Sequence, residues 1–337
     1  MNEVSSKEET GITKNPILDV ENLVVDFTNR NKLFSKQMIR AVNEVSFQLF
    51  RGEALAVVGE SGSGKSTCAR TLCKLNKHSG GVIRFDKQEI EAFDTPEERL
   101  KYASRMQMIF QDPFGSLNPV HTVEHHLTRP LRLHKPELSA ADLKEKIEIL
   151  LNQVGLTPVA ETAEKYPHEL SGGQRQRVAI ARALAVGAEV ILADEPISML
   201  DVSIRLGILN LMEEMKQKQE IAFLYITHDI ATARYFAERT AVMYVGHMVE
   251  WGDSEAVTQD PQHPYTQLLL DSVPDPRRSR ERRVKAAKAD VPMWTPESKG
   301  CPFAERCPKV MSKCREALPK ALQIGDQHFA RCFALEN

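Results

Sequence analysis

Short uninterrupted apolar runs alternate along this chain with longer stretches in which apolar residues recur at helical spacing. Such runs are typical of strands buried on both faces, and they lie at 54–59 (ALAVVG), 190–195 (VILADE) and 222–227 (AFLYIT). Helical spacing appears at 65–75, at 141–156 with an end at Gly155, and at about 203–218. Strands that alternate with helices in this way predict a parallel α/β sheet.

Further strands are indicated on either side of this pattern. They lie at 17–27, 41–50, 81–86 and 106–111, with a strand pair near 241–252. A basic loop separates the first two. Between about 112 and 175 the pattern becomes helical, which predicts a helical unit inserted between two strands of the sheet.

The N-terminal residues, the apolar runs and the net charge give no reason to expect a secreted, membrane-spanning or nucleic-acid-binding protein. Residues 1–15 are polar without an apolar centre, so we expect a flexible tail, neither a secretory signal nor an anchor. No apolar run approaches the ~18 residues that a spanning helix needs, so work at a membrane would require a partner. The formal net charge of -2 in 337 residues gives no reason to expect a nucleic-acid partner.

The glycine-rich segment after the first buried strand carries the clearest chemistry. It fits the phosphate-loop pattern G-x-x-x-x-G-K-[ST], and its residues are Gly59, Glu60, Ser61, Gly62, Ser63, Gly64, Lys65 and Ser66, followed by Thr67. The glycines let backbone N–H groups approach phosphate oxygens, and the following helix directs its N-terminal amides at an anion. Lys65 supplies charge for the outer phosphates and Ser66 a hydroxyl for Mg²⁺. The competing interpretation is a glycine turn before a helix. The strand–loop–helix context favours ATP binding, and we expect hydrolysis.

A second buried strand ends in two acids. Asp194 is placed to hold Mg²⁺, and Glu195 to act as base toward an attacking water. Taken alone, this segment is an ordinary buried strand that ends in carboxylates. Downstream of a phosphate loop it becomes the expected other half of the site.

The segment Leu170–Gln174 (LSGGQ) then identifies a family resemblance. Ser171, Gly172, Gly173 and Gln174 would start a helix whose amides face an anion. With the phosphate loop and the acidic strand, the chain resembles the ATP-binding subunits of ABC transporters. The resemblance implies a RecA-like core, an antiparallel β subdomain and an inserted helical subdomain. It also implies a head-to-tail dimer in which LSGGQ of one subunit completes the ATP site of the other.

The resemblance assigns further roles residue by residue. Gln111 matches the glutamine near Mg²⁺ and the attacking water, His228 the histidine at the γ-phosphate, and Asp201 the aspartate of the D-loop. The chain departs from the family at Met199, where alanine is usual, which places a bulkier residue at the dimer seam.

The roles of the aromatic side chains and of the remaining histidines are less clearly indicated by the sequence. The family stacks adenine on an aromatic ring near the end of the first strand. Phe27 is the first candidate and Phe34 the second, with a core or loop role as the alternative for each. Histidines 125, 126 and 168 have no supporting pattern and are interpreted as structural.

Two segments narrow the resemblance to one subfamily. Residues 111–119 (QDPFGSLNP) and 260–266 (DPQHPYT) resemble the importers of dipeptides, oligopeptides and nickel, and most closely their second ATPase subunit. Such importers pair two homologous ATPases with two membrane permeases and an extracytoplasmic binding protein, which places this chain at the cytoplasmic face of the inner membrane. The residues HPYT alone indicate a helix cap, with Pro264 in the first turn.

Six cysteines are present, and four lie near the C-terminus. Cys68 and Cys73 fall within the core, and the tail carries Cys301, Cys307, Cys314 and Cys332. Four thiolates can bind zinc or an iron–sulfur cluster, and free thiols remain open; the spacing lacks the tight pair common in zinc sites. The resemblance implies a [4Fe–4S] cluster, which we expect to be a structural staple. Disulfides are not expected, since the missing signal peptide indicates a reducing compartment.

The expected organisation has three parts. They are a tail at 1–15, an ABC ATPase domain at 16–255 with its helical subdomain at about 112–175, and a cysteine-rich extension at 256–337. A linker is expected at 274–300, and its basic run at 277–288 is either solvated or in contact with lipid or permease. The predicted function is ATP hydrolysis that drives peptide import. The alternatives are a non-transport ABC ATPase and an importer of nickel or oligosaccharides.

Overall fold

The protein is represented by a computed structural model that describes residues 15–29, 37–272 and 291–336. The expected tail at 1–15 (apart from residue 15), the candidate Phe34 and the basic run at 277–288 lie outside the described residues. Within the described ranges, no helix has both the length and the apolar character needed to cross a bilayer.

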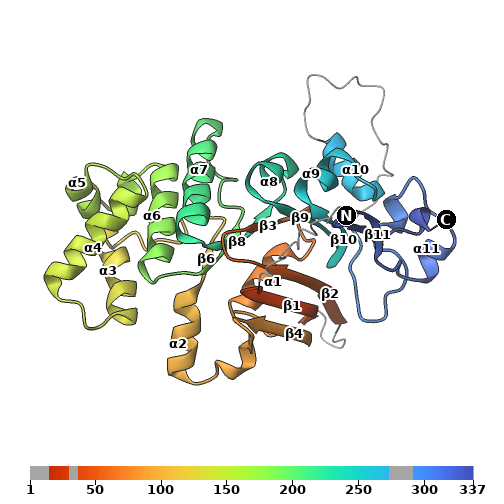
Figure 1. Ribbon diagram of the computed structural model, residues 1–337, viewed down its shortest axis with the longest axis horizontal. Coiled ribbons are helices and arrows are strands. Elements are labelled where there is room, and N and C mark those ends of the chain that lie inside the picture. The colour runs from red at the N-terminus through yellow and green to blue at the C-terminus, as the bar shows by residue number, and fades with distance from the viewer. Residues whose placement is uncertain (1–14, 30–36, 273–290, 337) are drawn as a thin grey trace, which may run out of the picture.

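A mixed sheet of eight strands forms the centre of the molecule (Figure 1), and its order is β11-β12-β10-β9-β3-β8-β7-β6. The parallel strands are β3 (Ala54–Val58), β6 (Met106–Ile109), β7 (Val190–Asp194), β8 (Ala222–Thr227) and β9 (Arg239–Tyr244). Every residue of β3, β7 and β8 is buried, as their uninterrupted apolar runs predict. The parallel α/β sheet is therefore confirmed, and β3 and β7 carry the two predicted halves of the site to one edge.

One end of this sheet is antiparallel and includes the C-terminal residues. Strand β10 (His247–Asp253) pairs with β9 on one side and with β12 (His328–Ala330) on the other, and β11 (Leu322–Gly325) forms the edge. Glu250 stands opposite Ala330 in this register. The extension therefore continues the central sheet.

A second sheet has four strands, all from residues 18–89, in the order β2-β1-β4-β5. Its strands are β1 (Leu18–Asn29), β2 (Gln37–Leu49), β4 (Gly80–Phe85) and β5 (Gln88–Glu89), and their pairing is antiparallel. Helix α1 (Lys65–Leu72) packs its buried side chains between this sheet and β7 and β8. Helix α2 (Pro96–Arg105), absent from the sequence interpretation, starts at a capping box between Thr95 and Glu98.

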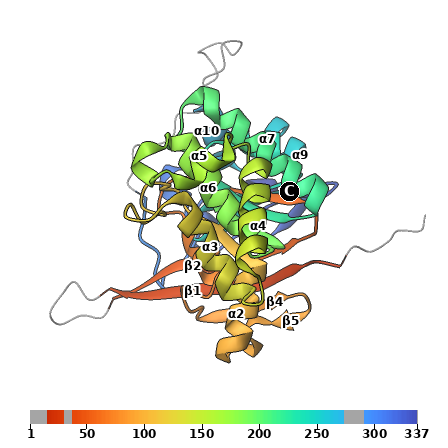
Figure 2. The same ribbon diagram turned by 90° about the vertical axis from the view of Figure 1, so that its left-hand side faces the viewer.

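The helical unit lies to one side of the sheets (Figures 1 and 2). Its helices are α3 (Val123–His134), α4 (Ala140–Gln153), α5 (Val159–Glu164) and α6 (Gly172–Ala185). Helical structure begins later than predicted, because two prolines, a glycine and an asparagine shape residues 112–122 into turns.

The remaining helices flank the sheet. They are α7 (Val202–Gln219), α8 (Ile230–Phe236), α9 (Ser254–Gln259), α10 (Pro264–Asp271) and the short α11 (Lys313–Glu316). One apolar cluster joins β9 and β10 to α9, α10 and the extension through Tyr244, Tyr265, Trp294 and Phe303. This cluster attaches the extension beside the phosphate loop.

Candidate functional site

The phosphate loop joins β3 to α1 and is supported from two sides. Gly64 has φ of 96°, and a Cβ at this position would lie 2.3 Å from the carbonyl oxygen of Ala41 on β2. The N–H of Gly246, in the turn between β9 and β10, donates to the carbonyl of Ser63 over 2.9 Å. Only glycine combines this left-handed conformation with this close approach, so the loop pattern follows from backbone packing as well as from phosphate chemistry.

Lys65 is buried within the loop it follows. Its Nζ donates to the carbonyls of Gly59 at 2.7 Å and Glu60 at 2.8 Å, and to Ser63 Oγ at 3.3 Å. Burial lowers the pKa of Lys65, and the nearby carboxylates of Glu195 and Asp194 oppose this shift. The ammonium group is thus held where the loop closes, with backbone carbonyls as its partners.

The two predicted halves of the site meet at Ser66 and Asp194. Ser66 Oγ donates to Asp194 Oδ1 over 2.9 Å, although the residues are 128 positions apart. Burial raises the pKa of Asp194, and the hydrogen bond from Ser66 opposes the rise. One carboxylate beside one hydroxyl is the protein share of a Mg²⁺ site that takes its other ligands from phosphates and water. The residues therefore fit Mg-ATP.

Glu195 is the centre of a second polar group at the same edge of the sheet. Its Oε2 accepts a hydrogen bond from Gln111 Nε2 at 3.0 Å and lies 3.2 Å from Nδ1 of His228. Glu195 has φ of 47°, a left-handed conformation that its N–H bond to the carbonyl of Ile226 holds at 2.9 Å. The three expected catalytic side chains therefore converge, each from the end of a different strand.

The LSGGQ segment begins α6 as expected. Ser171 is the N-cap: its N–H donates to Gln174 Oε1 at 2.9 Å, and the N–H of Gln174 returns the bond to Ser171 Oγ at 3.3 Å. Gly172 and Gly173 form the first turn. Helix α6 lies among the helices of the helical unit, apart from α1 (Figure 1). Within this chain, the segment is thus not brought to the phosphate loop.

An apolar surface surrounds the expected D-loop. Asp201 is exposed and precedes α7, with Met199 on one side and Val202 and Leu206 on the other, all exposed. Exposed apolar side chains grouped in this way are typical of a contact surface.

Phe27 lies near the end of β1 with 40% of its surface exposed. It pairs with Ile39 on β2, two residues before Ala41, whose carbonyl contacts Gly64. The ring is therefore on the strand pair that supports the phosphate loop, and it is available for stacking.

The sequence interpretation missed two residues that contact this loop. The N–H of Glu60 donates to Tyr265 Oη over 2.8 Å, and Arg306 bonds to both carboxylate oxygens of Glu60. His263 is the N-cap of α10 and Pro264 its first residue, so the predicted cap is confirmed. Periodicity gives no signal for the additional contact of Tyr265, since that contact depends on the tertiary fold.

The four cysteines of the extension do not form the expected metal site in the described residues. No group of three or more His, Cys, Asp or Glu side chains there is arranged to hold a metal ion. Burial raises the pKa of Cys301 to about 12, and the other three thiols add to the rise. The N–H of Cys301 donates to the carbonyl of Cys314 over 2.6 Å. The expected [4Fe–4S] cluster is therefore not supported by the described residues, although thiolates are the ligand type that such a cluster takes.

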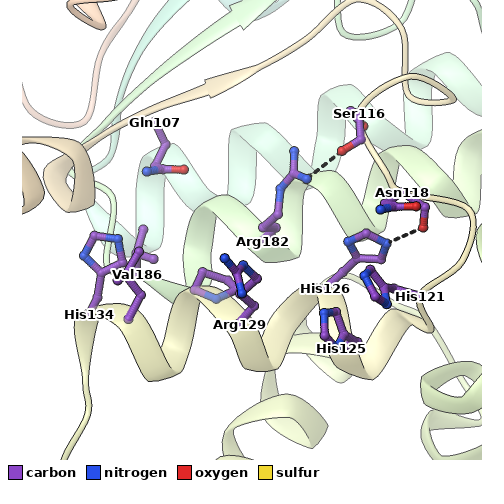
Figure 3. A pocket seen from close by; sticks show the side chains of 12 residues that line it. Gln107, Ser116, Asn118, His121, His125, His126, Arg129, His134, Arg182 and Val186 are labelled. Carbon is purple, nitrogen blue, oxygen red and sulfur yellow. Dashed lines mark hydrogen bonds between the residues drawn. The ribbon is translucent and has the colours of Figure 1, made fainter.

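A pocket of about 470 Å³ lies between α3, α6, the loop after Gln111 and β6 (Figure 3). Its described lining holds no carboxylate and includes two arginines and four histidines, which are Arg129, Arg182, His121, His125, His126 and His134. Arg182 donates to the carbonyl of Ser116 at 2.7 Å. His125 and His126, interpreted from sequence as structural, line this pocket. His168 instead stacks with Tyr166.

Comparison with known proteins agrees with this geometry. Residues 42–198 match the family described as ABC transporter, and residues 249–314 match the oligopeptide/dipeptide transporter C-terminal region. The chain is 41% identical over 329 residues to the oligopeptide transport ATP-binding protein AppF of Bacillus subtilis (strain 168), and the match covers 96% of this chain and 98% of AppF. It is 38% identical over 325 residues to the oligopeptide transport ATP-binding protein OppF of Haemophilus influenzae, with 95% and 97% covered.

A solved structure of similar fold is a dimeric post-hydrolysis state of the ATP-binding cassette MJ0796 bound to ADP and Pi. The TM-score is 0.62 at 28% identity, and the match covers 70% of this chain and 98% of that one.

Proposed function

The chain belongs to the ABC transporter family, among the ATP-binding subunits of oligopeptide and dipeptide importers, and we infer that it hydrolyses ATP to energise peptide import. The observation that carries this inference is the bond of Ser66 to Asp194, which joins the phosphate loop to the strand that ends at Glu195. A non-transport ABC ATPase is not favoured, because the relatives matched over nearly their whole length are named as transport proteins.

We propose the following roles within one ATP site. Lys65 and the loop amides hold the phosphates, and Ser66 and Asp194, with Gln111 nearby, hold Mg²⁺. Glu195 accepts a proton from the attacking water, and His228 contacts the γ-phosphate. The close group formed by Glu195, Gln111 and His228 supports these roles. The exposed ring of Phe27 is the proposed adenine platform.

The site is proposed to be completed by a second ATPase subunit. The capped start of α6, where Ser171 is exposed and Gly172 half-buried, is proposed to direct the backbone amides of its first turn at phosphates of a partner's ATP. The exposed apolar residues beside Asp201 support a contact surface there, where Met199 would lie against the partner. The dimeric state of MJ0796 with ADP and Pi supports such an arrangement.

Two permeases and an extracytoplasmic binding protein are the other proposed partners, and the proposed location is the cytoplasmic face of the inner membrane. The pocket in Figure 3 supports docking of a permease segment on the helical unit, as its positive lining and the exposed Leu133 suit an acidic, amphipathic helix. Its loop leads directly to Gln111 and so to Glu195. Dipeptides and oligopeptides are the proposed transported substrates. A transport assay that instead shows uptake of nickel or oligosaccharides would replace this assignment.

We further propose that the four extension cysteines hold a [4Fe–4S] cluster as a structural staple. The hydrogen bond from the N–H of Cys301 to the carbonyl of Cys314, which joins two of the cysteine-bearing segments, supports this proposal, and Lys309 near Cys307 would offset anionic charge. Iron, zinc and sulfide analysis of anaerobically purified protein, with its visible absorbance, tests it. Stoichiometric zinc in a colourless protein, or metal-free thiols, would exclude the cluster.

The proposed function is tested by Glu195→Gln in the assembled complex in vesicles. This variant keeps the shape of the side chain and is expected to bind ATP while turnover falls by about 10²-fold or more, because the proton acceptor is lost. Glu255→Gln, at an exposed carboxylate on α9, is the matched control. Undiminished turnover of Glu195→Gln would remove Glu195 from the mechanism.

A further inference from the structure

Two side chains of the C-terminal extension, Tyr265 and Arg306, contact the phosphate loop at Glu60. Arg306 Nη1 and Nη2 lie 2.7 Å and 2.9 Å from the two carboxylate oxygens of Glu60, so the ion pair is bidentate. The Glu60 N–H meanwhile donates to the hydroxyl of Tyr265 at 2.8 Å. Both the side chain and the backbone of Glu60 are therefore fixed by residues more than 200 positions away.

These contacts are held in place by an aromatic cluster. Tyr265 is fully buried, and its ring lies 4.6 Å from that of Tyr244 on β9 and 5.4 Å from that of Phe303. The Arg306 guanidinium lies over Tyr244 and Phe303 at 5.6 Å and 5.7 Å from the ring centres, and also bonds to Tyr244 Oη at 3.3 Å. Its side chain is only 14% exposed. A partly buried, bidentate pair with a third bond is far more ordered than an exposed surface pair.

The chemistry of Glu60 explains why such anchoring matters. A carboxylate in a phosphate loop adds negative charge beside a site for a polyanion, and this repulsion weakens nucleotide binding unless a cation neutralises it. Arg306 supplies that cation from outside the loop. Tyr265 accepts the N–H of Glu60, which fixes the direction in which the loop backbone leaves β3.

We propose that Arg306 and Tyr265 are positioning residues for ATP, through which the C-terminal extension sets the nucleotide affinity of the phosphate loop. The inference rests on the proposed function, since it assumes that this loop binds ATP. It gives the extension a direct share in the nucleotide site, in addition to any role as a staple.

The arrangement also links the loop to the cysteines. Arg306 precedes Cys307 directly and follows Cys301 within a short turn, and the N–H of Arg306 donates to the carbonyl of Phe303 at 3.0 Å. The place of the guanidinium is therefore set by the fold of the cysteine-bearing segment.

The test is a double-mutant cycle on the full chain, with Mg-ATP affinity measured by isothermal titration calorimetry. Arg306→Gln is expected to raise Kd about threefold to tenfold, the range for losing a well-ordered ion pair. In a Glu60→Gln background the same change is expected to alter Kd less than about twofold, because the carboxylate that Arg306 neutralises is gone. Arg306→Lys keeps the positive charge but cannot form the bidentate pair, so its affinity for Mg-ATP should lie between those of the wild type and Arg306→Gln.

Two further variants separate positioning from folding. Tyr265→Phe keeps the ring in its cluster and removes only the acceptor, and is expected to raise Kd severalfold. Arg315→Gln is the control, because Arg315 pairs with the exposed Glu305 at 3.5 Å in the same extension and should leave Kd unchanged.

The measured Kd values distinguish failure of this proposal from failure of the proposed function. An unchanged Kd in Arg306→Gln overturns the proposal, and so does an equal loss with and without Glu60, which would indicate a general effect on folding. A wild-type chain that binds no Mg-ATP would instead defeat the proposed function, so the two failures are distinguishable.

Discussion

Glu250 is the side chain whose replacement tests most directly how the extension is attached. It lies on β10 with no exposed surface, and its carboxylate accepts hydrogen bonds from the backbone of Gln262 and His263 at 2.8 Å and 2.9 Å and faces His328 Nε2 at 2.8 Å. One residue of the core sheet therefore forms hydrogen bonds with both the start of α10 and strand β12. The perturbation is Glu250→Gln, which preserves size and removes one acceptor oxygen.

The expected loss of folding free energy in Glu250→Gln follows from the two ways in which the new amide can be oriented. If its NH₂ replaces Oε2, it faces the N–H of His263; if it replaces Oε1, it faces Gln262 and His328. Either orientation leaves at least one buried donor without an acceptor and weakens the others. A buried unsatisfied group costs about 1–3 kcal/mol, and with the loss of charge-assisted bonds we expect about 3 kcal/mol.

The assay is urea unfolding followed by tryptophan fluorescence, and the chain suits it well. Its two tryptophans are Trp251, the neighbour of Glu250, and Trp294, which packs against His247 with ring centres 4.7 Å apart. Both therefore report on the attachment of the extension. Glu255→Gln is the control, since this exposed carboxylate should change stability by less than about 0.5 kcal/mol. If the two variants unfold at the same urea concentration, the role assigned to Glu250 is wrong.

Three other predictions concern pH, the phosphate loop and the pocket. Burial lowers the pKa of His247 to about 4 and of His263 to about 3, from 6.5, so the unfolded chain binds more protons in acid. Stability should be full above pH ~6.5 and fall by about 1.4 kcal/mol per pH unit for each histidine between pH ~6.5 and its folded-state pKa, which is about 4 for His247 and about 3 for His263; a melting temperature that is flat from pH 7 to 5 would contradict this. Gly64→Ala places a Cβ 2.3 Å from a backbone oxygen and should abolish ATP binding, whereas Gly187→Ala, at φ 87° with no atom within 4 Å, should cost only about 1 kcal/mol by thermal unfolding. Equal effects in both glycine variants would exclude the packing argument. Arg129→Glu reverses charge in the pocket of Figure 3 and should weaken co-purification with the permeases while ATP affinity is retained; intact assembly would remove the pocket from the interface.

The elements with strong local signals were predictable from sequence. Buried runs such as 222–227 appear as strands within those bounds, because a continuous apolar segment is stable only with both faces covered. The helix predicted at 203–218 is observed at 202–219. Helix α2 was predictable in principle, since Thr95, Pro96 and Glu98 form a recognisable start signal.

The extension shows what sequence patterns alone do not give. Strands β11 and β12 have only four and three residues, which is too short to establish a period, and their place in the sheet depends on the pairing of β12 with β10 and of β11 with β12. The contacts of Arg306 and Tyr265 with Glu60 join residues far apart in the chain, and no local rule encodes them. The convergence of Glu195, Gln111 and His228 could be expected only through the family resemblance.

The left-handed backbone of Glu195 has an evolutionary consequence. At φ of 47° a residue with a Cβ costs the fold about 1 kcal/mol relative to glycine. Glycine at this position would relieve that strain and remove the proposed proton acceptor. Selection for stability and selection for turnover therefore oppose each other at this codon. A lineage whose ATP site became unnecessary, for example because a paired subunit carried all the hydrolysis, would be expected to lose this carboxylate early, while the fold around it persisted.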